Sequence, residues 1–206
     1  MTGDIAQMYP YMIFTTLDHL EYPIITWLQN IDGTVLDSFS EIVSNITFML
    51  IVFGIIVFTL YLRKHHLWRP LLGALIIAIT IDFIVNEGFF KTLLVEFWVF
   101  RPRPYTIHPD LLQIGQGFHD SSFPSSHMAF TTLLVMIITY FEKWFLKYGI
   151  LIILLMWLSR VHNGMHYPTD VLMGTLMGVL YWFTGLYIMQ KFGLEKKHWW
   201  KKILEN

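Results

Sequence analysis

Long apolar runs alternate with short polar stretches along most of the chain. The runs lie at residues 46–62, 70–100, 128–141, 149–158 and 171–189. A helix that crosses about 30 Å of hydrocarbon needs about 20 predominantly apolar residues. In lipid, such segments must satisfy their own backbone hydrogen bonds, which favours helices. The pattern therefore predicts an all-α, integral-membrane helical bundle with about five transmembrane helices.

The first 45 residues differ from this pattern because they mix apolar and acidic positions. Their apolar segments, such as residues 22–28, are too short to cross a bilayer. We expect one or two amphipathic helices that lie in the membrane interface, and the alternative is a short soluble cap. The whole chain, 1–206, is predicted to be one domain: an interfacial segment at 1–45, a transmembrane core at 46–190 and a basic tail at 191–206. No cleaved signal peptide is expected.

The composition supports a membrane protein and excludes several kinds of chemistry. Of the 206 residues, 55% are hydrophobic and 14% are charged, whereas soluble domains carry about 25% charged residues. The net charge of −1 argues against nucleic acid as a partner. The chain has no cysteine, which excludes disulfides and thiolate metal sites.

The positions of the basic residues predict how the bundle is oriented. Five spans place the turns near 63–69 and 142–148 on the same side as the C-terminal tail. Ten of the 14 Lys and Arg residues fall on that side: 63, 64, 69, 143, 147, 191, 196, 197, 201 and 202. By the positive-inside rule this side is cytoplasmic. The loops 101–127 and 159–170 are then both expected on the outer face.

The stretch 159–170 holds the densest group of polar residues beside apolar runs, with Arg160, His166 and Asp170. Ionisable residues at membrane depth indicate a functional site. Pro168 suits the first position of a helix, which would place Asp170 in the first turn. A carboxylate four residues after a histidine can hold the imidazole in one tautomer, as for a nucleophile or base. The alternative is an interfacial loop whose polar residues face water.

Two further polar groups are expected on the same face. One is Arg101 and Arg103, and the other is Ser125, Ser126 and His127 at the predicted start of a helix. A helix N-terminus offers free N–H groups to an anion, and guanidinium groups match pairs of phosphate oxygens. These residue types together predict a phosphate pocket with one oriented histidine and a second histidine beside it.

At these residues the chain resembles the type 2 phosphatidic acid phosphatase family, which shares a fold with vanadium haloperoxidases and glucose-6-phosphatase and usually has six spans. The family shows Lys, six residues, Arg-Pro; then Pro-Ser-Gly-His; then Ser-Arg, five residues, His, three residues, Asp. The matching positions are Arg103, Pro104, Pro124, Ser125, His127, Ser159, Arg160, His166 and Asp170.

The chain departs from the family pattern at two positions. Ser126 stands where the family has glycine, and the family lysine falls on Glu96 when Arg103 is the motif arginine. Taking Arg101 instead places Leu94 there, so neither alignment restores the lysine. Lys91 lies nearby and is a candidate phosphate ligand. This departure bears on one phosphate ligand and on substrate preference, but not on the nucleophile.

The resemblance implies a metal-independent, two-step phosphoryl transfer without a cofactor. His166 would attack phosphorus and form a phosphohistidine, with Asp170 stabilising the imidazolium. His127 would act as general acid and then as general base. The phosphate oxygens would be held by Arg103, Arg160 and the N–H groups at Ser125 and Ser126, with Arg101 and Lys91 as further candidate ligands.

The predicted function is therefore a lipid phosphatase of a bacterial-type inner membrane, with its site on the outer, periplasmic face. The expected substrates are a polyprenyl diphosphate, phosphatidylglycerol phosphate, phosphatidic acid or the phosphate on lipid A. One alternative is a lipid phosphotransferase that passes the phosphoryl group to another lipid. The other is a non-catalytic membrane protein that binds an anion.

Overall fold

The computed structural model describes residues 14–31, 33–63, 68–93 and 100–193. All regular structure in these ranges is helical, which confirms the predicted all-α fold. The predicted basic tail beyond residue 193 and most of the basic cluster after Arg63 lie outside the described residues, as do Leu94 and Glu96.

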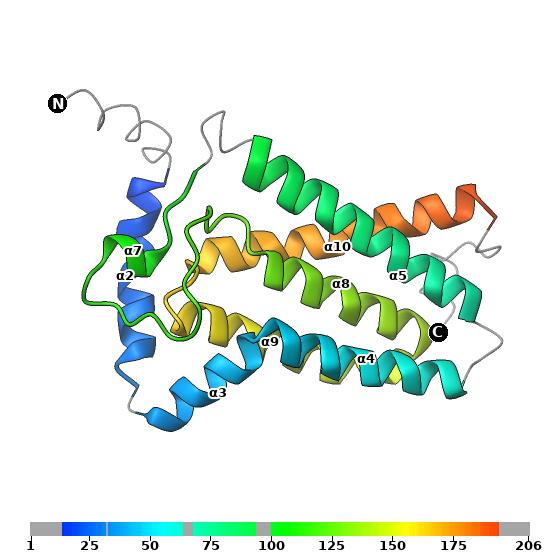
Figure 1. Cartoon of the computed structure of the whole chain (residues 1–206), viewed down its shortest axis with the longest axis horizontal. Helices are drawn as coiled ribbons and strands as arrows, with labels where there is room; N and C mark the ends of the chain where they lie inside the picture. Colours follow the sequence, from blue (N-terminus) through cyan, green and yellow to red (C-terminus); the bar gives the residue numbers. More distant parts are fainter. Residues whose placement is uncertain (1–13, 32, 64–67, 94–99, 194–206) are drawn as a thin grey trace.

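Five helices run along the length of the bundle (Figure 1). They are α4 (Ile46–Arg63), α5 (Trp68–Asp82), α8 (Ser126–Phe141), α9 (Leu146–His162) and α10 (Pro168–Lys191). Four segments are long and apolar enough to cross a membrane: Ile46–Arg63, Leu72–Lys91, Lys143–His162 and Pro168–Lys191. The predicted third span corresponds to α8, which at 16 residues is about 24 Å long and shorter than the hydrocarbon layer.

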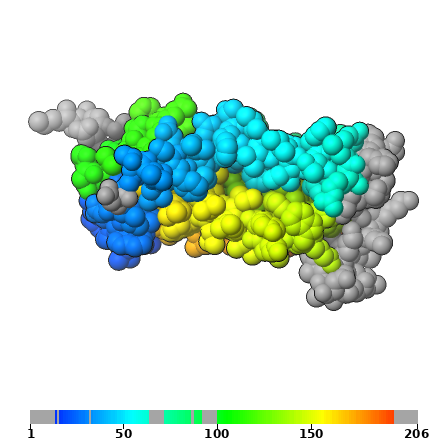
Figure 2. All heavy atoms as spheres, turned by 90° about the horizontal axis from the view of Figure 1, so that it is seen from below, coloured from blue at the N-terminus to red at the C-terminus, as the bar shows by residue number. Residues whose placement is uncertain are grey.

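Helix α8 occupies the middle of the bundle, with α5, α9 and α10 packed around it. Its side chains at Met128, Leu133 and Ile137 are fully buried. The outer helices show the opposite distribution, since apolar side chains such as Ile55 and Phe58 on α4 are exposed. Figure 2 shows the face formed by α4 and α9. Exposed apolar surface of this kind suits contact with lipid.

Helices α8 and α10 pack closely because α10 carries glycine where the two meet. A Cβ atom at Gly174 would overlap the carbonyl oxygen of Ser125, and one at Gly178 would overlap that of Ala129. The N–H of Ser125 also donates to the carbonyl of Asp170 at 3.1 Å. The first turns of α8 and α10 are therefore fixed against each other.

Two shorter helices, α2 (Thr15–Gln29) and α3 (Thr34–Ser44), lie at one end of the bundle with α7 (Pro104–Ile107) and the loop that follows it (Figure 1). The last residues of α4 and α8, Arg63 and Phe141, belong to helix ends that lie at the opposite end of the bundle (Figure 1). The two loops predicted to share one face therefore meet at one end of the molecule. The predicted amphipathic helices correspond to α2 and α3, but α2 buries two acidic side chains, Asp18 and Glu21.

The structure corrects one predicted boundary and reveals an irregular helix. The polar stretch was expected to be a loop from residue 159, but α9 continues to His162. It can continue because these side chains face protein: Ser159 Oγ donates to the carbonyl of Ser40 at 2.7 Å. At the end of α5 the chain continues as a π-helix, η2 (Phe83–Leu93), in which each hydrogen bond spans five residues instead of four.

Candidate active site

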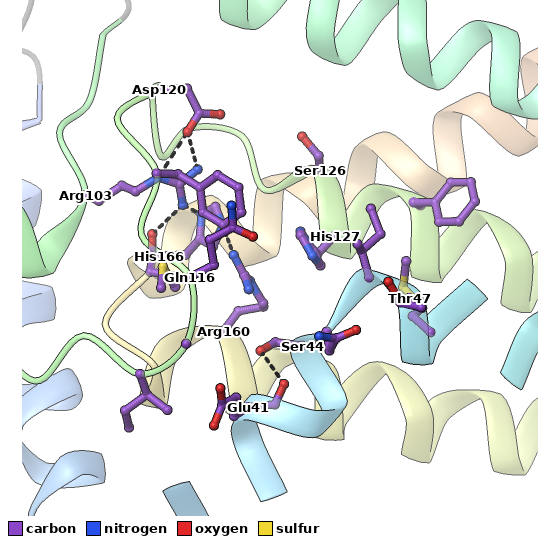
Figure 3. Close-up of a pocket in the computed structure, with 18 of the residues that line it drawn as sticks. Glu41, Ser44, Thr47, Arg103, Gln116, Asp120, Ser126, His127, Arg160 and His166 are labelled. Carbon is purple, nitrogen blue, oxygen red and sulfur yellow. Dashed lines mark hydrogen bonds and ion pairs between the residues drawn. The ribbon is translucent and has the colours of Figure 1, made fainter. Parts of the chain in front are cut away.

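A pocket of about 710 Å³ lies at the end of the bundle where the loops meet (Figure 3). Six of the residues predicted from the sequence line it: Lys91, Arg103, Ser126, His127, Arg160 and His166. They come from the π-helix, from the start of α7, from the start of α8, from the end of α9 and from the turn before α10. Segments far apart in sequence thus converge on one cavity.

His166 is buried, and its two ring nitrogens have different partners. Nδ1 lies 2.8 Å from the carbonyl oxygen of Ser122. Because a carbonyl can only accept, Nδ1 must carry the hydrogen and Nε2 the lone pair of the neutral ring. Nε2 lies 3.2 Å from Nη2 of Arg160 and 3.3 Å from Nη1 of Arg103. The nucleophilic nitrogen therefore faces two guanidinium groups.

The surroundings of His166 keep its imidazole neutral. Burial lowers the pKa of His166 well below 6.5, and the positive charges of Arg103 and Arg160 lower it further. At neutral pH the ring is therefore unprotonated. A neutral imidazole with a free lone pair is the form that can attack phosphorus.

Arg103 is held in place by a carboxylate that the sequence analysis did not single out. Asp120 accepts from Nη2 of Arg103 at 2.6 Å and from Nε at 3.2 Å. The remaining nitrogen, Nη1, donates to the carbonyl of Met165 at 3.1 Å and faces His166. The second oxygen of Asp120 lies 2.9 Å from Nζ of Lys91. Asp120 therefore joins two of the predicted phosphate ligands.

The positive charges of Arg103 and Lys91 determine the protonation state of Asp120. Burial raises the pKa of this carboxyl, but the charges of Arg103 and Lys91 outweigh burial and hold the pKa below its ordinary value. Asp120 is thus ionised at neutral pH. No sequence motif points to it, since it lies in a polar loop at no fixed distance from the motif residues.

Arg160 supplies the second guanidinium from the last turn of α9. Its side chain is buried, and its Nε has no hydrogen-bond partner among the described residues. A buried cation normally has its donors occupied. The free donor, together with Nη2 beside His166, indicates that the guanidinium is arranged to bind an anion.

His127 and Ser126 line the pocket from the first turn of α8. In the view of Figure 3, the guanidinium of Arg160 lies between the imidazoles of His127 and His166. Ser125 occupies the predicted N-cap position, but its side chain makes no capping hydrogen bond and is not part of the pocket lining. The start of α8 thus directs Ser126 and His127 toward the cavity, while Ser125 lies behind them.

Asp170 lies in the first turn of α10, behind Pro168, as the sequence predicts. Its Oδ2 is 3.9 Å from Nδ1 of His166, which is longer than a hydrogen bond. Oδ2 instead accepts from the N–H of Tyr167 at 2.9 Å. Nδ1 of His166 instead donates its hydrogen bond to the carbonyl of Ser122, a partner that the sequence pattern does not reveal.

Arg101 does not line the pocket. Its side chain is fully buried beside three carboxylates, those of Asp18, Glu21 and Asp170. Burial lowers the pKa of Arg101, but these carboxylates outweigh burial and raise the pKa above its ordinary value. Arg101 is a permanent cation whose partners are already present in the protein.

The pocket thus combines a neutral histidine, two guanidinium groups, a lysine from the end of the π-helix, and a second histidine at the start of α8. Such an arrangement can bind a tetrahedral anion and transfer it through nitrogen. Other residues in the lining were not predicted, among them Glu41, Gln116 and Phe118. They lie in polar or mixed segments without a motif.

Comparison with known proteins shows which family model and which relatives the sequence matches. The family model of the PAP2 superfamily matches residues 72–194. The bacitracin transport permease protein BcrC of Bacillus licheniformis is 35% identical over 81 residues, which are 38% of this chain and 38% of that protein. The chain therefore aligns with about two fifths of the length of this relative.

Two solved structures are similar to the fold. The structure of LpxE from Aquifex aeolicus has a TM-score of 0.56 and 21% identity, and the match covers 82% of this chain and 95% of that one. The PAP2 type phosphatidylglycerolphosphate phosphatase from Bacillus subtilis has a TM-score of 0.60 and 21% identity, with coverage of 86% and 88%. The fold is therefore that of membrane phosphatases of this type.

Proposed function

Because the chain belongs to the PAP2 superfamily, we propose that it is an integral-membrane lipid phosphatase that acts through a phosphohistidine. The observation that carries this proposal is the position of His166. Its Nε2 has the lone pair and faces the guanidinium groups of Arg103 and Arg160 at 3.3 and 3.2 Å. A phosphate bound by both guanidinium groups would have its phosphorus next to this nitrogen.

In the first step, Nε2 of His166 forms a bond to phosphorus while the bond from phosphorus to the lipid oxygen breaks. His127, on the other side of Arg160 in Figure 3, donates a proton to the departing oxygen. In the second step His127 takes a proton from water, and the water oxygen attacks phosphorus. The bond between phosphorus and Nε2 then breaks, and inorganic phosphate leaves.

The cations stabilise the charge on the transferred group. Arg103, Arg160 and Lys91 line the pocket and would bind the equatorial oxygens with the N–H groups at the start of α8. The carbonyl of Ser122 would keep Nδ1 protonated throughout, and it lies where it can stabilise the imidazolium of the intermediate. The reaction as drawn uses side chains and water, without a metal ion.

We propose that the substrate is a lipid phosphate or diphosphate. The candidates are a polyprenyl diphosphate, phosphatidylglycerol phosphate, phosphatidic acid and a lipid A phosphate. The pocket opens among apolar residues of the bundle, such as Ile46, Leu50 and Phe130, as well as polar ones. This mixed lining suits a phosphate group attached to an apolar chain.

We further propose that the pocket faces the outside of a bacterial inner membrane. Helix α4 ends at Arg63, and the turn after α8 begins at Lys143. The ends of α4 and α8 lie at the opposite end of the bundle from α2, α3 and α7 (Figure 1), and positive residues favour the cytoplasm. A reporter fused after Asn206 should then remain cytoplasmic. A reporter signal from the periplasm would contradict this orientation.

The test is phosphate release by the purified protein from a panel of these lipids, in the presence of a metal chelator. We expect release by the wild type, inhibition by vanadate, and loss of release in His166→Ala. The matched control is His19→Ala, which removes an exposed histidine outside the pocket and should not change the rate. The proposal fails if the wild type releases no phosphate or if His166→Ala is as active as the wild type. Transfer of the phosphoryl group to a second lipid without release would instead identify a phosphotransferase.

A further inference from the structure

A buried ionic cluster lies behind the pocket and joins it to α2. We define this cluster by Asp18, Glu21, Arg101 and Asp170. Asp18 Oδ1 accepts from Nη2 of Arg101 at 2.5 Å and from Nε at 3.0 Å. Glu21 Oε2 accepts from Nη2, and Asp170 Oδ1 from Nη1, each at 2.5 Å. The four side chains are between 0% and 7% exposed.

The cluster also holds the first turn of α10. Oε1 of Glu21 accepts from the N–H of Thr169 at 2.6 Å, and Oε2 accepts from the Thr169 hydroxyl at 3.0 Å. Nη1 of Arg101 donates to the same hydroxyl at 2.7 Å. The guanidinium carbon of Arg101 lies 3.9 Å from the centre of the Tyr167 ring. An acidic residue at a helix N-terminus is favourable, and here it comes from another helix, α2.

Two routes lead from Arg101 to the nucleophile. The side chain binds Asp170, and Asp170 accepts from the N–H of Tyr167, the residue after His166. The second route is through the main chain: the carbonyl of Arg101 accepts a hydrogen bond from the N–H of Ser122 at 2.8 Å. The carbonyl of Ser122 in turn binds Nδ1 of His166. The position of Arg101 therefore fixes both the turn that carries His166 and the atom that orients its ring.

Charge balance argues that the two α2 carboxylates do more than neutralise Arg101. Asp170 alone could balance the charge of Arg101, so Asp18 and Glu21 are two buried acidic groups beyond what charge balance requires. Burying ionic groups is costly, and a buried ion pair contributes little to stability compared with apolar packing. The α2 carboxylates do, however, determine the direction of the guanidinium, because together they take two of its three nitrogens.

We propose that Asp18 and Glu21 are positioning residues of the active site, which hold the His166 turn and the Ser122 carbonyl in place through Arg101. This inference rests on the proposed function. Both residues lie outside the segment 72–194 that matches the family. Helix α2 is on this view part of the catalytic unit, not a separate membrane anchor.

The proposal predicts a specific kinetic defect. Neither Asp18 nor Glu21 lines the pocket, so the cations that bind phosphate remain in place in their variants. A small displacement of the nucleophile slows the chemical step, and a 1 Å misplacement can cost about 100-fold. We therefore expect kcat to fall and KM to change little.

The test compares Glu21→Gln and Asp18→Asn with Asp110→Asn. Asp110 is an exposed carboxylate that accepts a hydrogen bond from Tyr22, a residue of α2 like Asp18 and Glu21. Its variant therefore removes an equal charge from outside the cluster. We expect kcat to fall about tenfold in the two cluster variants, with KM within about twofold of the wild type. The inhibition constant of vanadate, which resembles the transition state, should rise by the same factor as kcat falls. Asp110→Asn should match the wild type.

This readout separates positioning from folding. A smaller folded fraction lowers kcat but leaves the vanadate inhibition constant unchanged, and that outcome would overturn the proposal, as would unchanged kcat. If Glu21→Gln does not fold, the kinetics of Asp18→Asn test the proposal, because in that variant Glu21 and Asp170 still bind Arg101. If the wild type releases no phosphate, the proposed function fails instead. In that case, vanadate binding is compared through the increase in Tm that vanadate causes in the wild type and in each variant. An equal increase in all of these proteins would overturn the inference.

Discussion

Arg101 and Arg103 are two residues apart in the same Arg-Pro repeat, yet they lie in opposite surroundings. Arg103 lines the pocket beside His166 and shares Asp120 with Lys91. Arg101 points behind the pocket and is bound by three carboxylates. At the front of the site, Lys91, Arg103 and Arg160 line the pocket and two of them share Asp120; we call these four residues the front cluster. At the back, Asp18, Glu21 and Asp170 surround Arg101; we call these four residues the back cluster.

This difference assigns different roles to two chemically identical side chains. Several cations that converge on the wall of a pocket can bind an anion from outside, as a phosphate site requires. A cluster whose cation is already surrounded by carboxylates repels an anion. Arg103 therefore suits phosphate binding, and Arg101 suits positioning.

The largest effect is expected for Arg101→Met. Removing the guanidinium leaves three buried carboxylates without their cation, and breaking a buried ionic cluster in this way costs about 3–5 kcal/mol of stability. We expect a large decrease in Tm of the detergent-purified protein. Arg101→Lys keeps the positive charge but loses the branched guanidinium that binds three carboxylates, so its Tm should decrease less. If Arg101→Met kept the wild-type Tm, the back cluster would have no structural role.

The matched variant at the front, Arg103→Met, should show the reverse pattern. Arg103 touches the reacting centre, and loss of one such donor typically lowers kcat about 100- to 1000-fold. Its neighbour Asp120 is 37% exposed and can be hydrated, so Tm should change far less than in Arg101→Met. Phosphate release and thermal unfolding of both variants, measured in parallel, test the contrast. Similar defects in the two variants would contradict the division into front and back.

The contrast also shows which features the sequence predicts well. Apolar run length predicts the spans on the outside of the bundle, because lipid imposes a minimum length on them. It is less informative for α8, since a helix surrounded by other helices can be equally apolar at a shorter length. Similarly, the predicted end of the span at residue 158 was wrong because polar residues in the last turn of α9 are satisfied by protein, not by water.

Within the site, the alternation of the spans predicts that the loops carrying His127, Arg103, Arg160 and His166 share one face, and the structure brings these residues to one pocket. Spacing does not report contacts between distant segments. The link from Ser122 to His166, the bridge from Asp120 to Lys91 and the partners of Arg101 on α2 all join residues more than 25 positions apart. Such contacts depend on how loops pack at the bundle end, and a periodic pattern carries no information about that.

A smaller effect is expected for Asp120→Asn, which leaves the front cluster without its bonded carboxylate. Lys91 and Arg103 would then attract anions more strongly, so the inhibition constant of inorganic phosphate should fall. Arg103 would also be held less firmly, so kcat should fall. We expect the inhibition constant and kcat each to fall about threefold to tenfold. Hydrogen bonds to charged groups contribute about 1.5–3 kcal/mol when buried and less when partly exposed. His119→Ala, an exposed neighbour in the same loop, is the control and should change neither value.

The smallest effect concerns pH. The pKa of His166 is lowered by burial, and then by the charges of Arg103, Arg160 and Lys91. His166 attacks in its neutral form, so the acid limb of kcat/KM from this group should lie below pH 6.5. Lys91→Met removes one positive charge, which raises the pKa of His166 and moves the acid limb to higher pH. The ionisation of the substrate phosphate is the same for both proteins and cancels in the comparison. A limb that stayed in place or moved to lower pH would show that Lys91 does not act on His166, and the front cluster would then consist of the two arginines.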